Sequence, residues 1–142
     1  MDSAMSYIRT AINEVASITV PTIVLSLTPC TLECSKSPYQ VYWDEWGQKN
    51  YFDEVIPQIY RSTYATFKSE FDYTEASLSS ATKAKWTASG LRVDGSGSNT
   101  PWSEVNNMLW YSNAKSKGNA VWYSHGIIEL YPTEFVHVWG SQ

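Results

Sequence analysis

Hydrophobic residues are spaced along this chain in two ways, one typical of amphipathic helices and the other of short buried strands. Helical spacing predicts an amphipathic helix over residues 4–16. A run of β-branched and apolar residues at 22–27 then predicts a buried strand. A second apolar run at 54–60 predicts another strand of the same kind. Between these strands we expect a loop at 29–40 and a short helix or turn at 41–49.

The second half of the chain continues the alternation of helices and strands. A helix is predicted over residues 62–71, and Thr74 is a suitable N-cap for a following helix that Gly90 would end. The pair Thr100 and Pro101 opens a further helix in the preferred way. The remaining predicted elements are a strand at 91–93, a loop at 94–99, a strand at 120–123 and a short amphipathic segment at 132–139.

This order of elements indicates an α/β fold with parallel strands joined by right-handed crossovers. Each strand–helix unit takes about 30 residues, so the 142 residues hold about four units. A complete eight-fold barrel takes about 250 residues. We therefore expect a single domain over residues 1–142, built as half of a (β/α)8 TIM-like barrel with about four parallel strands. The alternative is a small open α/β sheet.

Composition and charge exclude several classes of protein. The net charge of −4 comes without a basic stripe, which argues against a nucleic-acid partner. No apolar run approaches the ~18 residues of a membrane span, and the first residues lack the pattern of a signal peptide. The two cysteines, Cys30 and Cys34, are too few for a metal site of their own, so neither a metal nor a cofactor is expected. A disulfide, favoured over a metal site, would fit an extracellular or organellar location, and two free thiols are the alternative.

Aromatic residues are unusually abundant, with seven Trp and ten Tyr. Their flat, amphipathic rings suit the C–H faces of sugars, and they also suit protein interfaces or an aromatic-rich core. The predicted strand at 54–60 ends in a cluster of polar side chains, which is where parallel α/β proteins bind ligands. The ligand-binding residues that we predict are Gln58, Tyr60, Arg61, Trp46, Trp122 and His125.

One acidic residue is a candidate for catalysis. Asp94 follows the predicted strand at 91–93, at the carboxyl end where parallel α/β barrels carry their catalytic residues. It lies in the sequence Asp-Gly-Ser-Gly, so a turn-forming role is the alternative and the favoured one. His125 also follows a predicted strand, and its ring could donate to a sugar hydroxyl or have a structural role.

Five short motifs resemble the glycosyl-hydrolase-like family 10 barrels, which are TIM-barrel proteins linked to bacterial glycan hydrolysis. Pro57-Gln58-Ile59-Tyr60 resembles the most specific of them, the P-Q-x-Y at the end of the sixth strand of that family. The other segments that resemble the family's strand ends are Ser26-Leu27-Thr28-Pro29, Asp44-Glu45-Trp46-Gly47 with Phe52-Asp53, Gly90-Leu91-Arg92-Val93, and the run from Gly118 to Ser124.

The resemblance implies that the chain corresponds to the C-terminal half of such a barrel. The acidic cluster at the end of the fourth strand would then be absent, although glycoside hydrolysis needs two carboxylates. We therefore expect a glycoside-hydrolase-like fragment that binds a glycan and is not catalytically complete alone. The alternative is a non-catalytic structural or interaction subunit. Unpaired strand edges favour a homo-oligomer, or a partner protein that completes the barrel.

Overall fold

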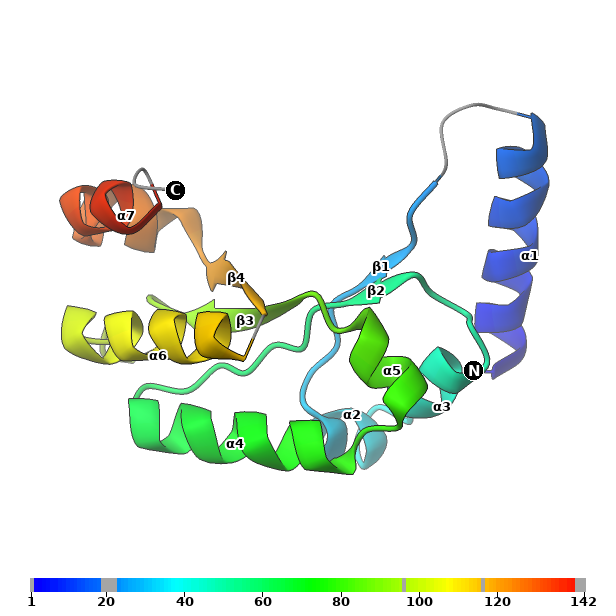
Figure 1. The fold of residues 1–142 in the computed structure, drawn as a ribbon, viewed down its shortest axis with the longest axis horizontal. Coiled ribbons are helices and arrows are strands. Elements are labelled where there is room, and N and C mark those ends of the chain that lie inside the picture. The colour runs from blue at the N-terminus through cyan, green and yellow to red at the C-terminus, as the bar shows by residue number, and fades with distance from the viewer. Residues whose placement is uncertain (1, 19–22, 96, 116, 140–142) are drawn as a thin grey trace. The chain divides into compact units, whose positions relative to one another are not determined.

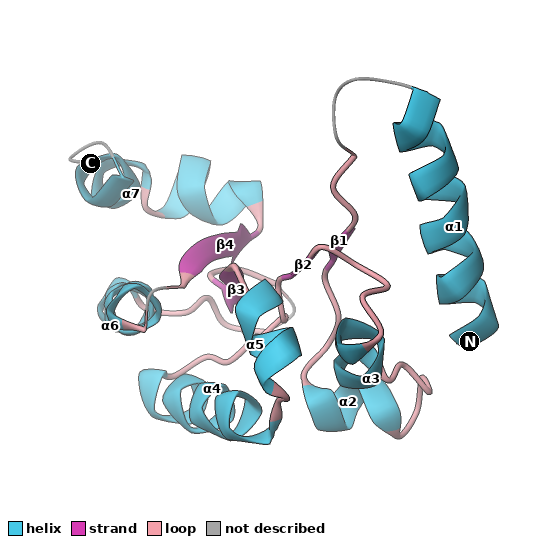
Figure 2. Ribbon diagram, turned by 45° about the vertical axis from the view of Figure 1, so that its right-hand side comes forward, coloured by secondary structure: helices cyan, strands magenta, loops and turns pink. Residues whose placement is uncertain are grey.

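The computed structural model describes residues 2–18, 23–95, 97–115 and 117–139. Contacts divide the chain into two compact units. Figures 1 and 2 show the helices and strands that make them up. Each unit consists of two stretches of chain that are separated in the sequence. Unit 1 comprises Met1–Gln58 and Tyr73–Thr87, and unit 2 comprises Ile59–Asp72 and Ala88–Gln142. The helix α4 (Tyr64–Ser77) contributes residues to both units.

Unit 1 contains a short parallel sheet and four further helices. Strands β1 (Ser26–Leu27) and β2 (Glu54–Val55) pair in parallel, and two single parallel bridges extend the pairing, Cys30 with Gln58 and Val55 with Trp86. The helices are α1 (Asp2–Ile18), α2 (Leu32–Lys36), α3 (Trp43–Gln48) and α5 (Ser80–Lys85). Helix α3 contacts both α2 and α5. The core of unit 1 consists of Leu32, Trp43, Trp46, Phe52, Val55, Leu78 and Trp86.

Unit 2 contains the longer strands, β3 (Ala88–Arg92) and β4 (Gly118–Trp122). They pair in parallel over five residues, from Ala88 opposite Gly118 to Arg92 opposite Trp122. Helix α6 (Trp102–Ala114) connects the two strands and packs on both. A π-helix, η1 (Gly126–Leu130), and helix α7 (Pro132–Trp139) follow β4. The core of unit 2 consists of Ile59, Phe67, Phe71, Leu91, Val93, Val105, Met108, Leu109 and Phe135.

The structure confirms an α/β fold in which all the described strand pairs are parallel. It shows two sheets of two strands each. The described residues contain no helix that is both long and apolar enough to cross a bilayer. The helix predicted at 4–16 agrees closely with α1, the short helix or turn predicted at 41–49 contains α3, and the amphipathic segment predicted at 132–139 is the helix α7. The predicted strand at 22–27 is reduced to β1, and its first residue lies outside the described part of the chain.

Several sequence-based boundaries are wrong. The expected loop at 29–40 contains α2, and Thr74 lies buried inside a continuous α4 and does not start a second helix. The cap of α5 is Ser79, whose hydroxyl accepts a hydrogen bond from the Thr82 N–H. Gly90 does not end a helix because it belongs to β3. The N-cap of α6 is Pro101, one residue later than Thr100.

Candidate functional site

The carboxyl ends of β3 and β4 lie at the same edge of unit 2, because the two strands are parallel. Asp94 follows β3 by two residues and His125 follows β4 by three residues. The structure brings the two together, with 2.5 Å between Oδ2 of Asp94 and Nδ1 of His125. The Asp94 side chain is only 11% exposed, whereas the His125 side chain is 44% exposed. A nearly buried carboxylate therefore holds an imidazole that solvent can reach.

The surroundings of Asp94 favour its ionised form. The Gly95 N–H donates a 2.6 Å hydrogen bond to Oδ1 of Asp94. This bond is the largest contribution that lowers the pKa of Asp94 below its usual 3.8, and His125 and the Tyr123 hydroxyl lower the pKa further. Gly95 has φ of 147°, a conformation that favours glycine, and the chain bends at residues 93–95.

We expect the Asp94 carboxylate to make stability depend on pH below about pH 4. Because the pKa of Asp94 is lower in the folded state than in the unfolded state, the stabilisation is present above about pH 4 and is lost as the pH falls through the folded pKa. We expect urea unfolding to show a difference in the free energy of unfolding between wild type and Asp94→Asn. This difference should become smaller as the pH falls from about 5 to about 3. The other carboxylates titrate in both proteins, so their contribution drops out of this difference. A difference in unfolding free energy that stays constant with pH would contradict the prediction.

Four rings form a continuous row at the same edge of unit 2, which we call the aromatic row: Tyr60, Trp122, Tyr123 and His125. Neighbouring ring centroids lie 6.1, 5.7 and 5.9 Å apart, and Tyr123 stacks on His125 at an interplanar angle of 25°. Trp122 is 52% exposed and Tyr123 is 41% exposed. The aromatic row thus offers flat apolar faces to solvent directly beside the Asp94–His125 pair.

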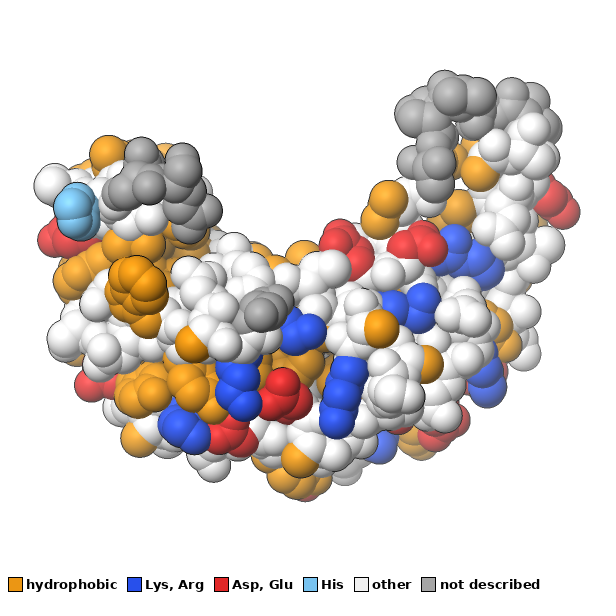
Figure 3. Space-filling view, in the orientation of Figure 1, with side chains coloured by type: hydrophobic (Ala, Val, Ile, Leu, Met, Phe, Trp, Pro, Cys, Tyr) orange, Lys and Arg blue, Asp and Glu red, His pale blue; other side chains and the backbone are white. Residues whose placement is uncertain are grey.

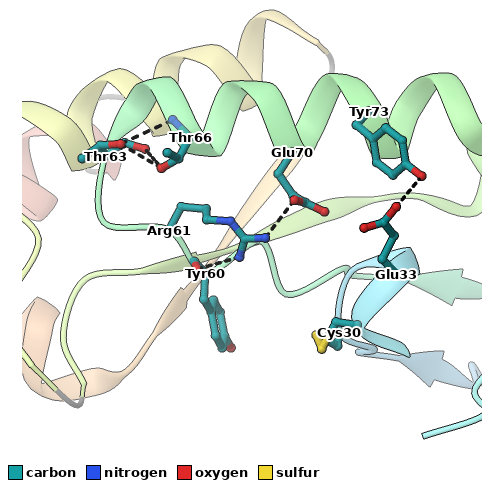
Figure 4. A network of polar contacts seen from close by, with 9 residues as sticks. Cys30, Glu33, Tyr60, Arg61, Thr63, Thr66, Glu70 and Tyr73 are labelled. Carbon is teal, nitrogen blue, oxygen red and sulfur yellow. Dashed lines mark hydrogen bonds and ion pairs between the residues drawn. A yellow bond between two sulfur atoms is a disulfide. The ribbon is translucent and has the colours of Figure 1, made fainter. Parts of the chain in front are cut away.

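Arg61 belongs to unit 2 and makes an ion pair there. Its guanidinium donates to Oε2 of Glu70 at 2.8 Å and to the Tyr60 carbonyl at 3.0 Å, as Figure 4 shows. The pair is partly exposed. The Glu70 contact fixes the direction of the guanidinium, and a ligand carboxylate would have to compete with Glu70 for it.

The remaining predicted ligand residues, Gln58 and Trp46, belong to unit 1. The Gln58 side-chain amide donates to the Thr28 carbonyl at 2.6 Å, close to the parallel bridge between Gln58 and Cys30. Trp46 is only 2% exposed, and its indole N–H donates to Asp2 at 2.6 Å. The structure therefore places Trp46 in the core of unit 1, away from solvent.

The two cysteines form a disulfide, Cys30–Cys34, which is one of the two states that their spacing left open. Beside it, the Tyr73 hydroxyl donates to Glu33 of α2 at 3.0 Å (Figure 4). Within the described ranges, no group of three or more His, Cys, Asp or Glu residues is arranged to hold a metal ion.

A family model described as glycosyl hydrolase-like 10 matches residues 2–124. The chain belongs to the glycosyl hydrolase-like 10 family. It has no significant match among curated proteins or solved structures. In this glycosyl hydrolase-like 10 chain the match includes β3, β4, Asp94 and most of the aromatic row, and it ends one residue before His125.

Sequence reasoning missed the pairing of Asp94 with His125, and it also missed Tyr123. The pairing could have been found, because each residue follows a predicted strand and parallel strands end at the same edge. Tyr123 was assigned to the strand at 120–123, and the structure places it just after β4 ends at Trp122. The π-helix η1 had no sequence signal that we can identify.

Proposed function

We propose that this chain binds a neutral glycan at the carboxyl edge of β3 and β4. The observation that carries the proposal is the aromatic row, whose exposed rings lead to an imidazole held by a buried carboxylate. Aromatic faces stack on the C–H faces of sugar rings, and a fixed imidazole can accept a directional hydrogen bond from a hydroxyl. Family membership supports a glycan over other ligands of the same shape.

We also propose that this chain is a fragment that is not catalytically complete by itself. Hydrolysis of a glycosidic bond requires two carboxyl groups about 5–10 Å apart. Asp94 is engaged by His125 and Gly95, and a lowered pKa suits it to stabilise charge and not to donate a proton. Glu129 of η1 is exposed, which favours a solvated role. A second acid from outside this chain would complete the pair.

We further propose that the chain corresponds to the C-terminal half of a (β/α)8 barrel. The motifs at the ends of β1 to β4 follow one another in the order of strands five to eight of the family, and the described strand pairs are parallel. A half-barrel would leave strand edges for another chain to cover. The partner would be a second copy or a protein that supplies the missing strands.

One observation favours the alternative function, a structural or interaction subunit. A groove of about 720 Å³ lies between α6 and α7 within unit 2. Trp110 lines it and is 63% exposed, and Figure 3 shows hydrophobic side chains gathered over these helices. Native mass spectrometry of wild type and Trp110→Ala separates the two functions, since a subunit that docks through this groove should lose its partner in the variant, whereas a chain that covers strand edges should stay bound.

Replacing Trp122 by alanine should weaken glycan binding about fivefold, because a stacked ring contributes about 1 kcal/mol beyond its buried area. Calorimetric titration with cellohexaose, xylohexaose and chitohexaose would measure the change on whichever probe the wild type binds. Trp110→Ala is the matched control, because Trp110 is exposed on α6 and lies outside the aromatic row. Equal loss in both variants, or no binding by the wild type to any probe, would reject the proposed site.

A further inference from the structure

The start of η1 approaches the end of β3 so closely that only glycine fits between them. Gly126 is buried, and a Cβ atom built on it would lie 2.6 Å from Cγ1 and 2.8 Å from Cβ of Val93. Cβ atoms do not tolerate contacts of this length, so any side chain at position 126 must move η1 or Val93. The residue directly before Gly126 is His125, and the residue directly after Val93 is Asp94.

The Val93 side of this contact is fixed. Val93 is fully buried, its N–H donates to the Trp122 carbonyl at 2.9 Å, and its own carbonyl accepts from Thr100 at 3.0 Å. The backbone directly before Asp94 is therefore hydrogen-bonded to Trp122, the last residue of β4, and to Thr100, which lies just before α6. Val93 cannot yield to a bulkier residue at 126 without disturbing these bonds.

The η1 side is also held by hydrogen bonds. The Gly126 N–H donates to the Tyr123 carbonyl at 3.0 Å, and the Gly126 carbonyl accepts from Tyr131 at 3.1 Å. The Tyr131 hydroxyl in turn donates to the Thr100 carbonyl at 2.9 Å. Wider helical turns of the π type recur at functional sites. The close packing of Gly126 on Val93 thus sets where His125 stands relative to Asp94.

We infer that Gly126 is a positioning residue, which holds His125 against Asp94 in the tautomer that carries its proton on Nδ1 and leaves Nε2 to accept a hydrogen from a glycan hydroxyl. An ionised carboxylate can only accept, so Nδ1 must donate to it, and in the neutral ring Nε2 is then the acceptor. The role of Nε2 rests on the proposed glycan site, whereas the role of Gly126 does not.

The test is the tautomer of His125, measured by long-range ¹H–¹⁵N NMR of the imidazole at mildly alkaline pH. The chain has two histidines, and a His137→Gln variant assigns their signals. Wild type should show the Nδ1–H form, and Gly126→Ala should shift the ring toward the Nε2–H form. Gly47→Ala is the matched control, because it also places a Cβ in close contact, there with Thr82 in unit 1, and should leave the His125 signals unchanged.

Two further variants keep the inference testable if Gly126→Ala folds poorly. Val93→Ala removes the nearest clashing atom, so the double variant Val93→Ala/Gly126→Ala should restore part of the wild-type tautomer. Asp94→Asn leaves the contact between Gly126 and Val93 intact and should weaken the preference for Nδ1–H. A wild-type ring in the Nε2–H form, or a ring in Gly126→Ala that matches wild type, would overturn the inference.

Glycan affinity provides the second readout. On any hexaose that the wild type binds, Gly126→Ala should lose about fivefold in affinity, the equivalent of one net hydrogen bond of about 1 kcal/mol. Unchanged affinity alongside an altered tautomer would remove the assigned role of Nε2. No wild-type binding to any hexaose would reject the proposed function, while the NMR result would still decide whether Gly126 positions His125.

Discussion

Replacing Phe71 by alanine should destabilise the protein by about 3–5 kcal/mol, the usual cost of removing a fully buried phenylalanine side chain. Phe71 of α4 is completely buried, with its ring edge-to-face against Tyr111 at 5.4 Å and beside Phe67 at 6.0 Å. The substitution removes these contacts and leaves a cavity that a helix cannot collapse to fill. Because small proteins are stable by only about 5–15 kcal/mol, this loss would be a large part of the total.

Urea unfolding followed by tryptophan fluorescence would measure this loss. The control is Ser69→Ala, an exposed substitution on the same helix, which should change the free energy of unfolding by less than about 0.5 kcal/mol. A loss below about 1 kcal/mol for Phe71→Ala would mean that the contact between α4 and Tyr111 is not part of the stable core of unit 2.

Gly47→Ala should cost about 2–3 kcal/mol, which is toward the upper end of the usual cost of overpacking a core. A Cβ at this position of α3 would lie 2.3 Å from Oγ1 of Thr82. Thr82 cannot retreat freely, because its buried hydroxyl donates to the Asp44 carbonyl at 3.0 Å and accepts from Ser79 at 2.9 Å. The same Asp44 accepts the Ser79 N–H at 3.0 Å, so moving Thr82 disturbs the start of α5.

A double-mutant cycle identifies the cause of this effect. Thr82→Ala removes the two nearest atoms that a Cβ at 47 would meet, Oγ1 and Cγ2, and it also removes the hydrogen bonds of the hydroxyl. The double variant Gly47→Ala/Thr82→Ala should therefore lose less stability than the sum of the single variants, with an interaction energy of about 1 kcal/mol or more in urea unfolding. Strictly additive losses would show that Gly47→Ala acts by some route other than Thr82.

The hydrophobic pattern predicted the positions of the strands better than their lengths. The apolar run at 54–60 suggested one strand, and β2 covers only Glu54–Val55. Pro57 supplies the physical reason, since proline has no N–H to donate to a neighbouring strand. Gln58 then resumes parallel pairing with Cys30 as a single bridge. The apolar pattern identifies which residues are buried. The length of a strand depends in addition on whether each residue has a backbone N–H that can bond to the neighbouring strand.

Helix boundaries failed where tertiary packing overrode local preference. Thr74 has the side chain of a good N-cap, yet it is completely buried inside α4, and its hydroxyl has no partner among the described residues. Burying the α4 face outweighs the local advantage of a cap. Ser79 has the same chemistry and does cap α5, because the chain turns there beside Asp44. From the sequence alone, nothing shows which of Thr74 and Ser79, five positions apart, caps a helix.

The candidate site was predictable in its location but not in its pairing. Asp94 and His125 were each singled out because they follow strands, and parallel pairing puts both at one edge. Trp46 was singled out for its aromatic ring alone, and it is buried. Exposure distinguishes Trp122 from Trp46, and exposure depends on contacts between residues far apart in the chain.

The two units are interleaved along the sequence, because each one takes a second segment from beyond the first segment of the other. No single break in the polypeptide therefore isolates either unit, because a fragment that keeps all of one unit also carries a segment of the other. A cut within residues 59–87 divides both units, so dissecting this protein into independently expressed pieces requires circular permutation or an engineered linker and not simple truncation.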